Sequence, residues 1–69
     1  MADDGVSEDA RIIAAAYADR VTELFKVFSE AVATGEPDRE AVVRFKRSLI
    51  SARHVRDLAL AAAKEAAAS

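Results

Sequence analysis

The sequence contains no cysteine, no tryptophan and a single histidine, His54, among its 69 residues. Disulfide bonds are therefore excluded, and no Cys/His cluster is present to bind a structural zinc ion. Glycine and proline are also rare, since Gly5, Gly35 and Pro37 are the only examples. The chain accordingly has few positions at which a regular helix must end.

Long apolar runs and an excess of one charge are missing as well. The longest uninterrupted apolar stretch, residues 12–18, is far shorter than the roughly 20 residues of a membrane span. The acidic N-terminus is unlike a secretory signal, and the balance of 10 basic against 12 acidic residues disfavours nucleic acid as a partner. We expect a soluble, cytoplasmic protein that does not enter a membrane.

Large apolar side chains are scarce, because 17 of the 36 hydrophobic residues are alanine. A domain of this size buries only about 60% of the surface that its unfolded chain exposes. A thin core in so short a chain needs further support. With disulfides and metal ligands absent, self-association is the support that this sequence has available.

The residues that break helices divide the chain into two helices. Ser7 is suited to cap the first helix, Gly35 to end it in a left-handed conformation, and Pro37 to begin the second. The predicted organisation is a flexible acidic tail over 1–6 and a single domain over 7–69, with helices at about 7–34 and 37–67 and a turn at 35–37. A turn this short permits only an antiparallel pair. The predicted fold is therefore an all-α antiparallel helical hairpin.

Apolar residues recur in the first helix at alternating spacings of four and three residues, from Ala10 and Ala14 through Tyr17 to Ala31. This is a heptad seam. The second helix has the same spacings, with Arg56 interrupting one seam position, at Val42, Phe45, Leu49, Ala52, Ala59, Ala63 and Ala66. Ile13, Phe25 and other apolar residues flank the seam of the first helix, so the apolar surface is wider than one partner helix covers. We expect two hairpins to pair as a homodimeric four-helix bundle. The predicted core and dimer positions are Tyr17, Val21, Leu24, Phe25, Phe28, Phe45 and Leu49.

Residues that face each other across this hairpin should have numbers that sum to about 72, because the turn is centred on residue 36. The sum places Arg53 and Arg56 near Asp19, and Lys46 near Glu23 and Glu30. The sequence therefore predicts ion pairs between the helices at these positions.

No group of side chains suited to catalysis is apparent. His54 does not belong to a Glu-x-x-His metal motif, and the sequence has no phosphate-binding glycine loop and no catalytic cysteine. Asp19 and Glu23 lie one turn apart, but they should face water and remain ordinary carboxylates. We expect a protein that is not an enzyme and has no cofactor or metal.

Two helix surfaces are suited to binding another protein. In the second helix, Val43, Arg47, Ile50 and His54 recur at i, i+4, i+7 and i+11, which is the spacing of a docking stripe for a partner helix. The first helix presents a net acidic stripe, whose charges suit a basic surface such as that of a DNA-binding domain. Single exposed aliphatic residues would explain the pattern in the second helix equally well. For the acidic stripe taken alone, a solvated surface with weak pairs such as Arg20–Glu23 and Lys26–Glu30 is the simpler explanation. The candidate partner-binding residues are Asp19, Glu23, Glu30, Val43, Arg44, Arg47, Ile50 and His54.

Three features together carry a family resemblance: the length of 69 residues, the acidic opening MADDG over 1–5, and two helices joined by TGEPD over 34–38. In these the chain resembles the small anti-activator, or anti-quorum-sensing, proteins of Mu-like Pseudomonas phages. The resemblance implies a dimeric hairpin in the cytoplasm of a bacterial host that binds and inhibits host proteins. In that family the targets include the DNA-binding domain of a LuxR-type quorum-sensing activator and the type IV pilus assembly ATPase.

Two other functions fit the same fold. One is an RNA-binding four-helix bundle similar to the Rop family, although acidic residues on the first helix disfavour contact with phosphates. The other is a structural subunit of a larger assembly.

Overall fold

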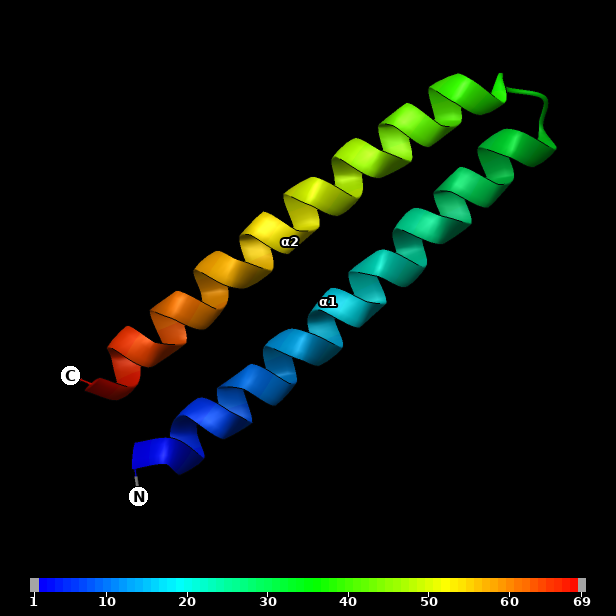
Figure 1. The fold of residues 1–69 in the computed structure, drawn as a ribbon. Helices are drawn as coiled ribbons and strands as arrows, with labels where there is room; N and C mark the ends of the chain where they lie inside the picture. Colours follow the sequence, from blue (N-terminus) through cyan, green and yellow to red (C-terminus); the bar gives the residue numbers. More distant parts are fainter. Residues whose placement is uncertain (1, 69) are drawn as a thin grey trace.

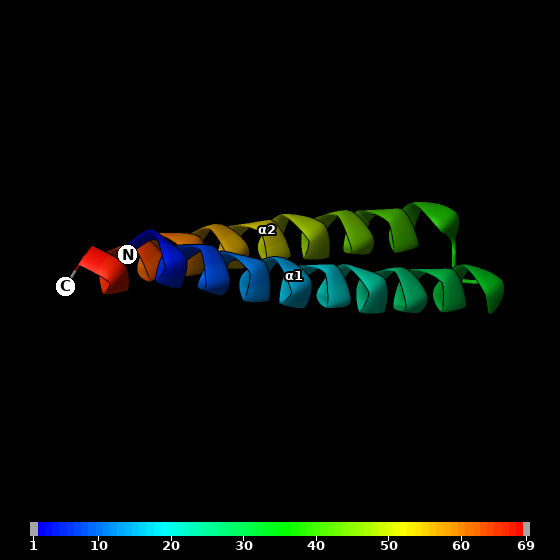
Figure 2. The ribbon, with the colours of Figure 1, turned by 90° about the horizontal axis from the view of Figure 1, so that it is seen from below.

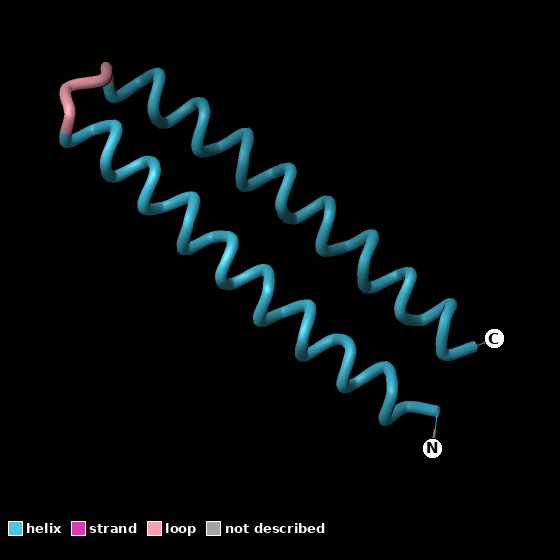
Figure 3. The backbone as a smooth tube through the Cα atoms, turned by 180° about the vertical axis from the view of Figure 1, so that it is seen from behind, coloured by secondary structure: helices cyan, strands magenta, loops and turns pink. Residues whose placement is uncertain are grey.

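The protein is an antiparallel hairpin of two long helices, as the sequence predicts (Figure 1). The computed structural model describes residues 2–68, with side chains from Gly5 onward. Helix α1 spans Ala2–Ala33 and helix α2 spans Asp38–Ala68. The start of α1 and the end of α2 lie at one end of the molecule and the turn lies at the other (Figure 3). Across residues 2–68, neither helix contains a segment long and apolar enough to cross a membrane.

Helix α1 begins five residues before the predicted start at Ser7, so the predicted boundary between a tail and the helix is wrong. Gly5 lies inside the helix, because one glycine lowers helix propensity by about 1 kcal/mol without removing a backbone donor. Val6 is half-buried and lies on the same side of α1 as Ala10 and Tyr17. The longer helix thus extends this side of α1 by a further apolar residue at the open end of the hairpin.

The turn closes α1 with the backbone pattern known as a Schellman motif. Gly35 has a φ of 95°, and its N–H donates to the carbonyl of Val32 at 3.2 Å. The N–H of Glu36 reaches back to the carbonyl of Ala31 at 3.0 Å. These bonds satisfy helix carbonyls that would otherwise lack partners. The predicted role of Gly35 is confirmed.

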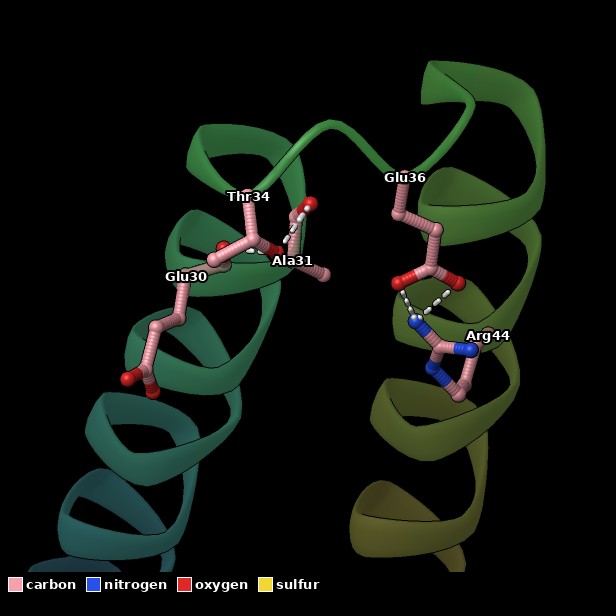
Figure 4. Close-up of polar contacts among 5 residues, drawn as sticks. All are labelled: Glu30, Ala31, Thr34, Glu36 and Arg44. Atoms are coloured by element: carbon pink, nitrogen blue, oxygen red, sulfur yellow. Dashed lines mark hydrogen bonds and ion pairs between the residues drawn. The ribbon is translucent and has the colours of Figure 1, made fainter.

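Side chains reinforce both sides of the turn (Figure 4). The Thr34 hydroxyl donates to the carbonyl oxygens of Glu30 and Ala31, at 3.0 and 3.2 Å. Beyond the turn, Nη2 of Arg44 donates to both carboxylate oxygens of Glu36 at 2.6 Å. This ion pair ties the segment before α2 to the second turn of that helix.

The helices meet along a narrow seam. Phe28 of α1 stacks on Phe45 of α2, with ring centroids 4.8 Å apart and planes inclined by 26°. Among side chains from Gly5 to Ala68, only Leu24 and Ala41 are buried, at 9% and 1% exposure. The facing of Phe28 and Phe45 agrees with the predicted hairpin register.

The seam differs from the predicted one at both of its ends. Ala41 is 1% exposed, whereas Val42, which the heptad pattern placed in the seam, is 49% exposed. In α1, Ile13 is half-buried and Ala14 is exposed. A straight helix of 3.6 residues per turn drifts from a strict seven-residue repeat. Over eight or nine turns this drift moves the contact line by about one residue.

The molecule is a single layer of two helices, and its shape is extended (Figure 2). Its Cα radius of gyration is 15.9 Å, against about 11 Å for a compact domain of this length. Its accessible surface is 5355 Å², roughly 1,100 Å² more than the approximately 4,200 Å² typical of a monomer of this mass. One hairpin therefore leaves much of its surface uncovered.

Candidate protein-binding surfaces

Nine large aliphatic or aromatic side chains are between 39% and 61% exposed. They are Ile12, Phe25, Val27, Val32, Val42, Val43, Ile50, Val55 and Leu58. Single exposed aliphatics are ordinary on proteins, but here the exposed residues gather on separate sides of the hairpin. Each side therefore has to be considered as a surface of its own.

The most apolar side is the Phe25 face, which we define as Val21, Phe25, Val32, Val42 and Leu49. Phe25, Val32 and Val42 line an open hollow of about 490 Å³ beside the turn. Val21 and Leu49 are half-buried and extend this face toward the middle of the hairpin. Phe25 is 57% exposed, although the sequence places it with the core and dimer positions. Within the hairpin alone, its ring has little to pack against.

The opposite side holds a groove of about 460 Å³, which we call the Tyr17 groove. Its walls on α1 include Ala16 and Arg20, which lie across the seam line from Phe25. Both polar and apolar side chains line it: Ile13, Ala16, Tyr17, Arg20, Ser48, Ser51, Ala52, Val55, Arg56 and Ala59. This groove is thus a mixed surface, in contrast to the Phe25 face.

Arg56 lies in the floor of this groove at a seam position. Its guanidinium carbon is 4.6 Å from the centroid of the Tyr17 ring, a cation–π contact. Its Nε also donates to Oδ1 of Asp57 at 3.2 Å. The aromatic face and the neighbouring carboxylate accommodate a charge where the heptad pattern calls for an apolar residue.

The predicted ion pairs between the helices are absent. Within residues 5–68, Asp19, Lys46 and Arg53 form no ion pair, and Arg56 meets Tyr17 instead of Asp19. Glu23 is bonded within its own helix, to Nη1 of Arg20 at 3.3 Å. Asp19 and Glu23 lie on the side of α1 that points away from α2, so they are out of reach of the bases.

The acidic stripe of α1 consists of Asp19, Glu23, Lys26 and Glu30. All four side chains are exposed, and all four lie on the side of α1 remote from the seam. Ile12, also exposed, continues the stripe toward the open end of the hairpin. The structure therefore brings the three predicted acidic residues onto one accessible surface.

The outer stripe of α2 consists of Val43, Arg47, Ile50, His54 and Leu58. All five are exposed, and they fall within about one quarter of the helix circumference, directly opposite the seam. Leu58 was not among the predicted binding residues, although its spacing of four from His54 continues the pattern. Arg44, which was among them, flanks this stripe with its guanidinium already bonded to Glu36.

A metal centre does not emerge from the described part of the chain. No three His, Cys, Asp or Glu residues among 2–68 are grouped so that they would hold a metal ion. The ion pairs of Arg20 with Glu23, Arg44 with Glu36 and Arg56 with Asp57 each join residues no more than eight positions apart. What the side chains do form is a set of distinct apolar and charged surfaces.

Comparison with known proteins gave no relatives: the chain matches no family model, no curated protein and no solved structure.

Proposed function

We propose that this chain is a protein-binding module that works as a homodimer and inhibits the protein it binds. The observation that supports this most strongly is the large exposed apolar surface, carried by nine side chains on separate sides of the hairpin. Apolar patches of this extent are typical of surfaces that other proteins cover. The proposal assigns no catalytic residue and no cofactor to the chain.

The second copy fits best on the Phe25 face. This face gathers an aromatic ring and several branched aliphatics beside the turn, while the Tyr17 groove contains two arginines and two serines. Homodimer interfaces are the more apolar class of interface. A standard interface covers about 800 Å² per partner, which would remove most of the excess surface of the single hairpin. The result would be a four-helix bundle.

The surfaces that point away from this interface remain available for another protein. The acidic stripe of α1 suits a basic surface, because opposite charges speed association and select partners. This fits the resemblance to phage anti-activators, whose targets in the host cytoplasm include the DNA-binding domain of a transcription activator and a pilus ATPase. We extend that family's inhibitory role to this chain as part of the proposal.

The test is a tagged pull-down from bacterial lysate at moderate salt, with nuclease added, followed by mass spectrometry. The proposal predicts that the wild-type chain enriches a bacterial protein, and that this protein loses activity when the purified chain is added. A double variant, Asp19→Lys with Glu23→Lys, should lose a partner that binds the acidic stripe. Recovery of RNA instead of protein, when nuclease is omitted, would contradict the proposal in favour of a Rop-like bundle.

A further inference from the structure

The outer stripe of α2 is a surface that neither the hairpin nor the proposed dimer covers. Val43, Ile50 and Leu58 are spaced seven and eight residues apart, so they lie along one line on the helix, spanning about 22 Å. All three are exposed. The line is long enough to contact roughly four turns of a partner helix.

The surroundings of these aliphatics are strongly basic. Residues 39–58 contain six arginines and lysines and two acidic residues, Glu40 and Asp57. An open hollow of about 550 Å³ at the turn end of the stripe is lined by Arg39, Glu40, Val43, Arg44 and Arg47, three bases against one acid. Among residues 5–68, neither Arg39 nor Arg47 has an ion-pair partner. Their charges are therefore free to meet those of a ligand.

We infer that the outer stripe of α2 binds an acidic amphipathic helix of a partner protein. Apolar residues of that helix, spaced by seven, would pack on Val43, Ile50 and Leu58, as in other helix-docking surfaces. Its flanking carboxylates would pair with Arg39 and Arg47, where arginine suits bidentate contact. This inference rests on the proposed function, because it names the chemistry of one protein that the module binds.

Two other occupants fit the stripe less well. A second copy docked through the same stripe would bring Arg47 and His54 of one chain near the same bases of the other, and like charges oppose pairing. Nucleic acid would use the arginines but gain nothing from Val43, Ile50 and Leu58. The phenylalanine and tyrosine side chains, which would stack on nucleobases, all lie away from this stripe.

The experiment measures fluorescence anisotropy of labelled synthetic peptides titrated with the full-length protein. The probe is a helical peptide of about 18 residues, with leucines at i, i+4, i+7 and i+11 and glutamates on both flanks. A second peptide has lysines in place of the glutamates, and the third probe is a single-stranded RNA. We expect the acidic peptide to bind at least about tenfold more tightly than the basic one, and more weakly as salt is raised.

Matched variants then locate the site. Arg47→Glu should weaken binding of the acidic peptide about tenfold. Lys64→Glu makes the same type of charge change beyond the stripe and should alter the affinity by less than about twofold. Ile50→Ser should also weaken binding of the acidic peptide, while Val55→Ser, in the Tyr17 groove, should not. Ile50 and Val55 are similarly exposed, at 55% and 61%. All four variants should keep wild-type helicity because these side chains lie outside the buried seam.

Three outcomes would overturn the inference: equal affinity for the acidic and basic peptides, an unchanged affinity in Arg47→Glu, or preferential binding of the RNA. The lysate pull-down separates this failure from failure of the proposed function. If Arg47→Glu and Ile50→Ser still capture the partner as well as wild type, the outer stripe is not its site, although the chain binds proteins. If wild type captures no protein, the proposed function itself fails.

Discussion

At the scale of single residues, the two glycines show how position determines the role of one residue type. Gly35 has a positive φ and closes α1, whereas Gly5 is an interior helix residue. Nothing lies within 4 Å of a Cβ built on either one. The role of Gly35 was predictable because Pro37 follows it. That of Gly5 was not, because no local signal in the sequence requires the helix to begin before Ser7.

The same substitution should therefore have opposite effects at the two glycines. Gly35→Ala should lower the free energy of unfolding by about 1 kcal/mol, since an L side chain is strained at positive φ. Gly5→Ala should raise it, by less than about 1 kcal/mol near a helix end. Urea unfolding followed by circular dichroism, at one fixed protein concentration, measures both. A destabilised Gly5→Ala would contradict the helical position of residue 5.

Arg56 is a charged residue at a seam position, where the heptad pattern predicts an apolar one. The pattern identified the seam position correctly, but the cation–π contact with Tyr17 depends on ring and guanidinium geometry that spacing does not reveal. The contact covers the aromatic face and the arginine stem together. Arg53, three residues earlier, is exposed and makes no such contact.

Removing these two arginines should give different results. Arg56→Ala should lower the free energy of unfolding by about 1 kcal/mol, because the cation–π contact and the packing of the stem are both lost. Arg53→Ala should change it by less than about 0.5 kcal/mol, as exposed substitutions usually do. The measurement is again urea unfolding at fixed concentration. Equal effects of the two substitutions would show that the Tyr17 contact adds no stability.

At the scale of the helices, the number, direction and turn of the two elements were predictable, and the exact contact line was not. Gly35 and Pro37 define the hairpin because the chain has few other residues that end a helix. Alanine-rich sequence leaves the register weakly specified, since neighbouring positions such as Ala41 and Val42 are both apolar. The structure buries the smaller residue, Ala41, and leaves Val42 49% exposed.

Enlarging the buried alanine tests this register. Ala41→Leu should lower the free energy of unfolding by about 1–3 kcal/mol, because a close-packed site has no room for the added side chain. Ala61→Leu is the control, since Ala61 is an exposed residue of the same helix. It should stay within about 0.5 kcal/mol of wild type. Tolerance of leucine at position 41 would contradict the contact line described above.

At the scale of the whole molecule, the hairpin has the helices of a stable domain without a core of matching size. Two buried side chains among residues 5–68, Leu24 and Ala41, offer little to offset the conformational entropy of ordering so many residues. The sequence allowed the exposed surfaces to be predicted, including the outer stripe of α2 and the acidic stripe of α1. It does not identify a partner, because one sequence specifies which side chains are exposed and not what covers them.

The proposed dimer makes the Phe25 face sensitive to charge. Phe25→Asp should convert dimers to monomers and lower helicity, because a carboxylate would be buried at an apolar interface. Val55→Asp places the same charge on an equally exposed residue of the Tyr17 groove and should leave the dimer intact. Analytical ultracentrifugation with circular dichroism measures both effects. If Val55→Asp dissociates the dimer and Phe25→Asp does not, the dimer interface lies at the Tyr17 groove and not at the Phe25 face.

The most direct test of the central claim, that the exposed apolar surface of this hairpin is made to be covered by protein, is the native mass of the wild-type chain. Light scattering after size exclusion, combined with thermal unfolding over a range of concentrations, measures it. We predict a mass twice that of the 7.4 kDa chain and a melting temperature that rises with concentration. A stably folded monomer, with full helicity and a melting temperature independent of concentration, would contradict the account.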